Sequence, residues 1–146
     1  MHTLYDQDFY EWTRKNAQLL REGRLSEIDT NNLIEELEAM GRSEKRAFVN
    51  HLAVLIAHLL KWERQPVLRS KSWRYTIREQ RAQVADIFED NPSLKHSLGD
   101  LLSKAYGKAI LRVVKETGLD EEAFPAACPY SAELIMDAAF FPGEEA

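Results

Sequence analysis

Basic residues gather in one stretch of this otherwise acidic chain, from residue 61 to residue 81. The stretch has seven Lys or Arg residues and two Glu residues, a charge of +5, whereas the remainder has 12 basic and 22 acidic residues, a charge of −10. Within it, Lys71, Arg74 and Arg78 are three and four residues apart, so they share one face of a helix. Cationic side chains on one face attract phosphate and carboxylate groups. We therefore predict that these three residues contact an anion.

Aromatic residues in the same stretch raise a nucleic-acid hypothesis, because bases stack on such rings beside cations. By helical periodicity, however, Trp73 faces inward and Trp62 ends an apolar stripe, which favours core packing for both rings. The whole chain carries a net charge of −5, which argues against a general nucleic-acid-binding protein. A nucleic-acid-associated protein that uses the basic helix face is therefore an alternative and not the main prediction.

Two histidines, His51 and His58, lie on one edge of an apolar stripe and are separated by about 10.5 Å along a helix axis. One metal ion holds nitrogen ligands at about 2.0–2.1 Å, so this spacing does not favour a metal site. We predict no metal and no cofactor. If the histidines face a space between helices, they form a polar pocket for a ligand or for hydrolysis. The candidate residues for that pocket are Glu36, His51, His58, Arg69 and Arg81.

Arg81 projects close to the apolar face of its predicted helix. Burying an arginine without a partner costs free energy, so we expect this side chain to pair with a carboxylate. The best candidates are Glu35, Glu36 and Glu38. The sequence also lacks a phosphate-binding glycine loop and a nucleophile elbow, so it indicates no specific catalytic site.

The chain has 146 residues, which suits a single domain that buries roughly 68–70% of the surface exposed by its unfolded chain. Its one cysteine, Cys128, has no internal disulfide partner, which fits a reducing compartment. The first ten residues lack the basic start and apolar core of a signal peptide. The longest apolar run, residues 52–60, is shorter than the about 20 residues that span a bilayer. We expect a single helical-bundle domain over residues 1–146, located in the cytoplasm and outside the membrane.

Apolar residues recur at spacings of three and four along most of the chain, which is the helical period. The expected helices cover residues 6–22, 30–40, 43–64, 71–90, 92–117 and 130–137. Gly41 and Ser43 should kink or split the long stretch between residues 30 and 64. Ser70 or Ser72, Asn91 and Gly118 are predicted caps. The predicted fold is all-α, an antiparallel helical bundle with a four-helix core and a short C-terminal capping helix.

Six short runs stand out when they are taken together in their order along the chain. They are residues 33–38 with Gly41, 58–62, 69–70 with 72–73, 91–94, 116–119 and 128–130. This set resembles the bacterial family called domain of unknown function 29, and the resemblance covers nearly the whole chain. It implies an all-helical bundle and no established activity.

The main functional hypothesis is a small cytoplasmic helical-bundle interaction module without catalysis. It rests on the clear periodicity of core-forming residues and on the absence of a specific catalytic motif in the sequence. It predicts a protein partner or self-association. A ligand-binding protein or hydrolase that uses the polar pocket is one alternative. The nucleic-acid-associated protein is the other, and the sequence leaves enzymatic activity open.

Overall fold

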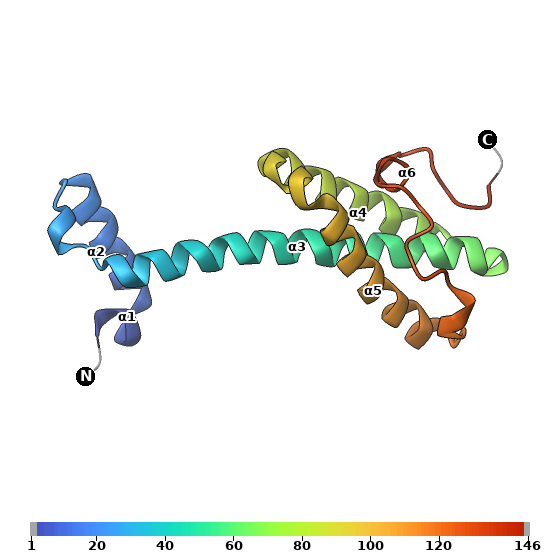
Figure 1. Cartoon of the computed structure of the whole chain (residues 1–146), viewed down its shortest axis with the longest axis horizontal. Helices are drawn as coiled ribbons and strands as arrows, with labels where there is room; N and C mark the ends of the chain where they lie inside the picture. Colours follow the sequence, from blue (N-terminus) through green and yellow to red (C-terminus); the bar gives the residue numbers. More distant parts are fainter. Residues whose placement is uncertain (1–2, 145–146) are drawn as a thin grey trace. The chain divides into compact units, whose positions relative to one another are not determined.

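The computed structural model describes residues 3–144 and contains helices but no strand within them. The α-helices are α1 (Leu4–Gln7), α2 (Phe9–Arg21), α3 (Thr30–Arg64), α4 (Lys71–Asp90), α5 (Leu98–Thr117) and α6 (Ala132–Met136). Short 3-10 helices cover Leu25–Glu27, Pro66–Leu68, Pro92–Ser97 and Glu121–Ala123. The all-α prediction is therefore confirmed (Figure 1). No helix within residues 3–144 has the length and apolar character needed to cross a bilayer.

By their internal contacts the residues divide into two units, a first unit of residues 1–43 and a second unit of residues 44–146. The first unit contains α1, α2 and the start of α3. The second unit contains the remainder of α3 together with α4, α5 and α6. The single domain and the four-helix core stay predictions.

The first unit is organised around the indole of Trp12, which is buried and donates a hydrogen bond from Nε1 to the Asp29 carboxylate at 2.9 Å. The predicted helix over residues 6–22 is two helices, because the Asp8 side chain accepts from the Glu11 amide and starts α2 there. Phe9 and Leu20, apolar residues of α2, are about half exposed at 50% and 47%. The buried residues of α2 are Trp12, Asn16 and Leu19, and the half-exposed Phe9 ring stacks on Trp12 with the two centroids 5.6 Å apart.

The second unit holds the large hydrophobic core. The second half of α3 buries Phe48, Leu52, Leu55 and Leu59 against α4 and α5. These side chains recur every three or four residues, so they form one stripe that faces the two neighbouring helices. α6 is short but contributes the fully buried Ile135 and contacts α4. The core thereby fixes the four helices whose surfaces form the candidate sites.

The prediction that Gly41 splits the long helix was wrong, because α3 is continuous from Thr30 to Arg64. Glycine in a helix interior costs about 1 kcal/mol relative to alanine. The flanking residues are good helix formers, and Arg42 lies 4.0 Å from Glu38 as a favourable pair one turn away. These local gains outweigh the glycine, and Ser43 remains inside the helix without starting a new one.

Two of the predicted caps are confirmed and one is wrong. The Ser70 hydroxyl accepts from the Trp73 amide at 3.1 Å, and Gly118 ends α5 in the left-handed region at φ 75°. Asn91 makes no cap for the following helix; its side-chain amide donates to Glu44 at 3.0 Å and to the Ile87 carbonyl at 2.9 Å. The Ile87 carbonyl at the end of α4 also accepts from the Asn91 backbone amide at 2.9 Å, so the side chain adds a second bond there, and a 3-10 helix intervenes before α5.

Candidate functional site

The residues of the predicted polar pocket fall into both units. Glu36 belongs to the first unit, where its carboxylate accepts a hydrogen bond from the Tyr5 hydroxyl. That bond and the negative charge of Glu36 raise the pKa of Tyr5 to about 12. His51, His58, Arg69 and Arg81 belong to the second unit. A pocket that joins Glu36 to these four residues stays a prediction.

The two histidines have separate partners. His51 Nδ1 lies 2.7 Å from the side-chain oxygen of Gln80 on α4. His58 Nδ1 lies 2.9 Å from the Val54 carbonyl of its own helix, and burial lowers the pKa of its imidazole. Both rings are half-buried, and each has one hydrogen-bond partner, on α4 for His51 and on α3 for His58. Within residues 3–144 no group of three or more His, Cys, Asp or Glu side chains is placed to hold a metal ion.

Arg81 is buried, with 6% of its surface exposed, and its predicted pairing with Glu35, Glu36 or Glu38 was wrong. Its guanidinium donates instead to three backbone carbonyls, those of Ile135 at 2.7 Å, Phe140 at 2.6 Å and Ala138 at 3.5 Å. Burial lowers the pKa of Arg81. Carbonyls satisfy the donors of a buried arginine without a carboxylate, and a sequence pattern does not show which carbonyls will be near.

Arg69 also donates hydrogen bonds to two backbone carbonyls, one on α3 and one after α6. Its Nε donates to the Trp62 carbonyl at 2.8 Å and its Nη2 to the Pro142 carbonyl at 3.3 Å. Together with Arg81, it holds down residues 137–144, which we call the C-terminal segment. Two of the arginines that sequence reasoning assigned to a polar pocket thus bind backbone.

A basic cavity of about 500 Å³ lies between α4 and the C-terminal segment. It is lined by Lys71, Arg74, Tyr75, Arg78, Arg81, Ala138 and Phe141. The three residues predicted to contact an anion are all among them, so the structure brings them to one cavity. Among these described lining residues four are cationic and none is acidic.

The ring of Phe141 forms one wall of this basic cavity. The guanidinium carbon of Arg74 lies 4.4 Å from its centroid and 5.0 Å from that of Trp62, and the two rings are 5.1 Å apart. Arg74 Nη2 also contacts the Glu144 carboxylate at 3.2 Å, and the two side chains of this pair are 50% and 37% exposed. Sequence reasoning missed Phe141, because its position depends on how the C-terminal segment folds back over α4.

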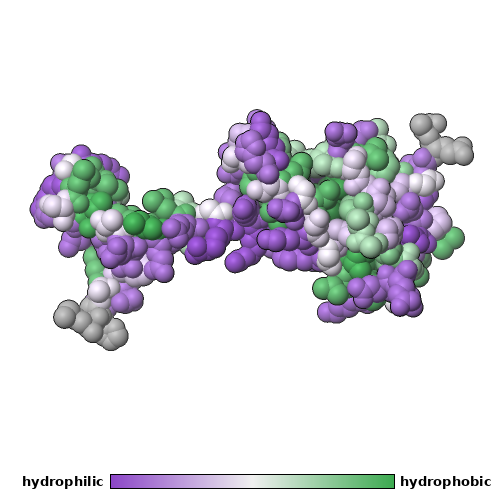
Figure 2. Space-filling view, viewed as in Figure 1, coloured by the Kyte–Doolittle hydropathy of each residue, from purple (hydrophilic) through white to green (hydrophobic). Residues whose placement is uncertain are grey.

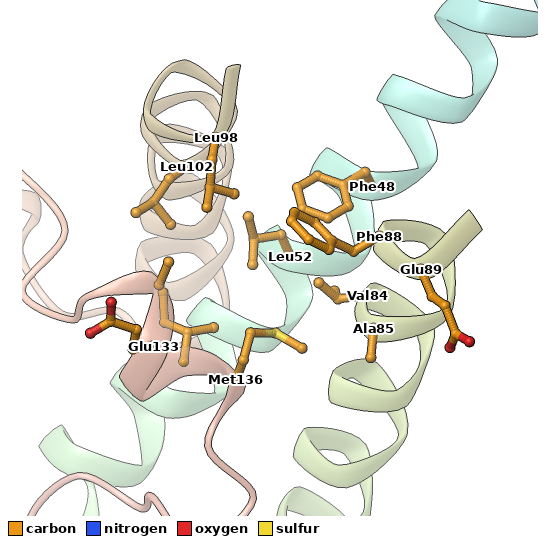
Figure 3. Close-up of a pocket in the computed structure, with 12 residues that line it drawn as sticks. Phe48, Leu52, Val84, Ala85, Phe88, Glu89, Leu98, Leu102, Glu133 and Met136 are labelled. Atoms are coloured by element: carbon orange, nitrogen blue, oxygen red, sulfur yellow. The ribbon is translucent and has the colours of Figure 1, made fainter. Parts of the chain in front are cut away.

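An apolar groove of about 410 Å³ lies elsewhere on the second unit, between α3, α4, α5 and α6 (Figure 3). Its lining residues are Phe48, Leu52, Val84, Ala85, Phe88, Glu89, Leu98, Leu102, Ala132, Glu133, Ile135 and Met136. Among these described lining residues, Glu89 and Glu133 are the ionisable ones. They lie at opposite edges of the groove in Figure 3.

Sequence reasoning missed the groove because helical periodicity shows that residues such as Phe88, Leu98 and Leu102 belong to apolar faces but not what covers those faces. In the structure these side chains are partly exposed and pack only against the edge of the core. A signal was present in Ala85 and Ala132, since small side chains at these positions leave space between helices that larger ones would fill.

Comparison with known proteins gives a family but no function. No curated protein and no solved structure matches the chain. The model of the family described as domain of unknown function DUF29 matches residues 4–141, which is nearly the full length and includes every candidate residue named above. This chain therefore belongs to the DUF29 family.

Proposed function

We propose that this chain is a bacterial cytoplasmic interaction module without catalysis, whose apolar groove holds one helix of a partner protein. The observation that carries the proposal is the groove itself, a cavity of about 410 Å³ with an almost wholly apolar lining. Apolar surface open to water is a common mark of a protein-binding site. The reducing compartment is supported by the chain's one cysteine, Cys128.

A helix suits the shape of this groove better than an extended peptide does. The walls are helices, so they offer no free strand edge to which an extended chain could add. A helix docks in such a groove through apolar side chains spaced three and four residues apart. Met136 lines one wall, and a flexible thioether side chain adapts to ligands of different shape.

The charge at the groove selects the kind of helix. Glu89 and Glu133 lie at its edges, so Lys or Arg residues that flank the apolar face of the partner would meet opposite charges. This favours a cationic amphipathic helix.

A second copy of this chain fits the groove less well. One set of its exposed apolar residues lies on α3, where Ile34, Leu37 and Met40 are 49%, 63% and 63% exposed, and hydrophobic residues are visible at the surface of the first unit in Figure 2. The residues interspersed with them are acidic, at positions 35, 36 and 38. Docking them in the groove would bring carboxylates toward Glu89 and Glu133. The charges therefore favour a different protein as the partner.

The test uses a labelled cationic amphipathic peptide of about 16 residues, a scrambled peptide of the same composition and an acidic amphipathic peptide. Fluorescence anisotropy should show binding of the cationic helix and at least about tenfold weaker binding of the other two, a difference of about 1.4 kcal/mol. Ala85→Arg places a bulky charge in the groove and should abolish binding. Ala82→Arg, on an exposed position of the same helix outside the groove, is the matched control and should bind like the wild type.

Charge reversal separates the electrostatic part of the proposal from the apolar part. Glu89→Lys with Glu133→Lys should weaken the cationic peptide and strengthen the acidic one. Equal binding of all three peptides would contradict a specific groove. Binding of a fatty acid in the groove, without binding of any peptide, would show a lipid-ligand site and would overturn the proposal.

A further inference from the structure

We propose that the basic cavity between α4 and the C-terminal segment binds a diphosphate group. This site is separate from the apolar groove and does not depend on the proposed helix partner. Three cationic side chains, Lys71, Arg74 and Arg78, converge on a cavity of about 500 Å³, and the fourth, Arg81, forms part of its wall. A volume of this size is typical of sites for small ligands.

The spacing of the cations indicates more than one phosphate group. Lys71, Arg74 and Arg78 lie on successive turns and span about 10.5 Å along the helix axis. Two linked phosphate groups present oxygens along this length, so they can contact all three cations at once with less bending of the side chains than one phosphate group would require. Arginine binds phosphate oxygens in a bidentate manner and lysine as a point charge, so the set provides both modes.

Two of the cationic side chains in the cavity are not paired with a carboxylate of the described residues. Within residues 3–144 neither Lys71 nor Arg78 forms an ion pair. Both side chains are exposed. An anion therefore meets two cations that need not first release another carboxylate among the described residues.

The position of these cations on α4 supports a role in binding. Lys71 and Arg74 lie at the start of a 20-residue helix, where the helix dipole disfavours positive side chains. The positive end of the dipole attracts an anion. Cations placed there are unfavourable for the empty helix and favourable for an anionic complex, which is the pattern expected at a binding site.

Glu144 indicates how the site would open. Its carboxylate contacts Arg74 Nη2 at 3.2 Å, so an acidic group already pairs with one of the cations that a phosphate oxygen would contact. The pair is about half exposed, and such pairs contribute little to stability. A diphosphate can therefore displace Glu144 from Arg74.

A short ligand fits these charges better than a nucleic acid does. Glu144 contacts Arg74, and the whole chain has a net charge of −5, so phosphates extending beyond the cavity meet repulsion. Tyr75, which also lines the cavity, is 59% exposed and offers a ring on which a nucleobase can stack. The shared chemistry is the diphosphate, and its source is either inorganic pyrophosphate or a nucleoside diphosphate.

The test is isothermal titration calorimetry at low salt with pyrophosphate, ADP and orthophosphate as probes. Pyrophosphate or ADP should bind, and orthophosphate should bind about tenfold more weakly or worse, since it loses at least one charge-assisted contact. Lys71→Ala with Arg78→Ala should weaken the diphosphate probe by about tenfold or more. Lys95→Ala with Lys104→Ala removes the same charge from exposed positions outside the cavity and should stay within about twofold of the wild type.

Further measurements distinguish pyrophosphate from a nucleoside diphosphate as the ligand and define the results that would contradict the proposal. Tighter binding of ADP than of pyrophosphate, lost in Tyr75→Ala, assigns a nucleoside diphosphate; equal binding assigns the diphosphate alone. Glu144→Gln should strengthen binding in either case. The proposal is overturned if no diphosphate binds, if the cavity variant binds like its control while both remain folded by circular dichroism, or if a single-stranded oligonucleotide binds more tightly than either probe.

Discussion

The apolar groove and the basic cavity both use α4, yet their charges are opposite. The first half of the helix gives Lys71, Arg74 and Arg78 to the basic cavity, and the second half gives Ala85, Phe88 and Glu89 to the groove. This arrangement opposes the helix dipole at both ends. The net charge of the chain is a sum over both surfaces, so it describes neither of them. The charge of each surface, taken separately, indicates which ligand that surface attracts.

The two sites also share the residues that follow Tyr130. Ile135 and Met136 line the groove, whereas Ala138 and Phe141 line the basic cavity. A change that loosens this part of the chain should therefore affect both sites, and a change in one lining should affect that site alone. Predictions can be ordered by this distinction.

The largest effect is expected for Arg81→Met, because Arg81 holds the carbonyls of Ile135 and Phe140. Removing the guanidinium leaves buried carbonyls without donors and should cost about 3 kcal/mol of unfolding free energy. Urea unfolding measures the loss, and both probes should bind more weakly. Arg78→Met, at an exposed position of the same helix, should unfold like the wild type. An equal loss of unfolding free energy in the two variants would show that the hydrogen bonds of Arg81 do not stabilise the fold.

Phe141→Ala should separate the two sites. The ring packs on Trp62 and on the guanidinium groups of Arg74 and Arg81, and it is half-buried, so its truncation should cost about 2 kcal/mol. Thermal unfolding gives this value. Diphosphate binding should weaken while peptide binding persists under conditions where the variant is folded. If the variant lost peptide binding and kept diphosphate binding, Phe141 would belong to the groove and not to the basic cavity.

Tyr130→Phe should weaken both sites slightly through stability. The Tyr130 hydroxyl donates to the Glu63 carboxylate at 2.7 Å, and its loss should cost about 1 kcal/mol. Burial and this bond raise the pKa of Tyr130, so the unfolded phenol ionises first, near pH 10, and wild-type stability falls as the pH rises above that value. Urea unfolding between pH 8 and 11 should show a flatter alkaline decline for the variant, and identical slopes would contradict the raised pKa of Tyr130 in the folded protein.

Glu144→Gln is expected to have the smallest effect on stability. Its pair with Arg74 is half exposed, so the change in unfolding free energy should be below about 0.5 kcal/mol and should vanish at high salt. Chemical unfolding at two salt concentrations measures it. A large, salt-independent loss would mean that Glu144 holds the C-terminal segment in place and does not leave Arg74 for a ligand.

Local signals in the sequence predicted the helices well. Ser70 and Gly118 act as predicted because a cap depends on residues within one turn. Gly41 did not, because the sum of its neighbours' preferences exceeds the cost of one glycine. The shared face of Lys71, Arg74 and Arg78 was predictable for the same local reason, and the structure brings all three to one cavity.

Long-range features were not predictable from periodicity. The Arg81 side chain was expected to find a carboxylate, but its partners are carbonyls more than fifty residues away. The groove was missed because an apolar stripe identifies a face and not what covers it, so Leu98 and Leu102 looked like core. Both features depend on the course of residues 130–144, where the helical period is weak.

The most direct test of two separate sites with opposite charge is to measure both probes on both cavity variants. Ala85→Arg should lose the cationic peptide and bind diphosphate within about twofold of the wild type. Lys71→Ala with Arg78→Ala should lose diphosphate and bind the peptide within about twofold. If each variant loses both probes, or if neither variant loses its own, the account of two independent sites on α4 is wrong.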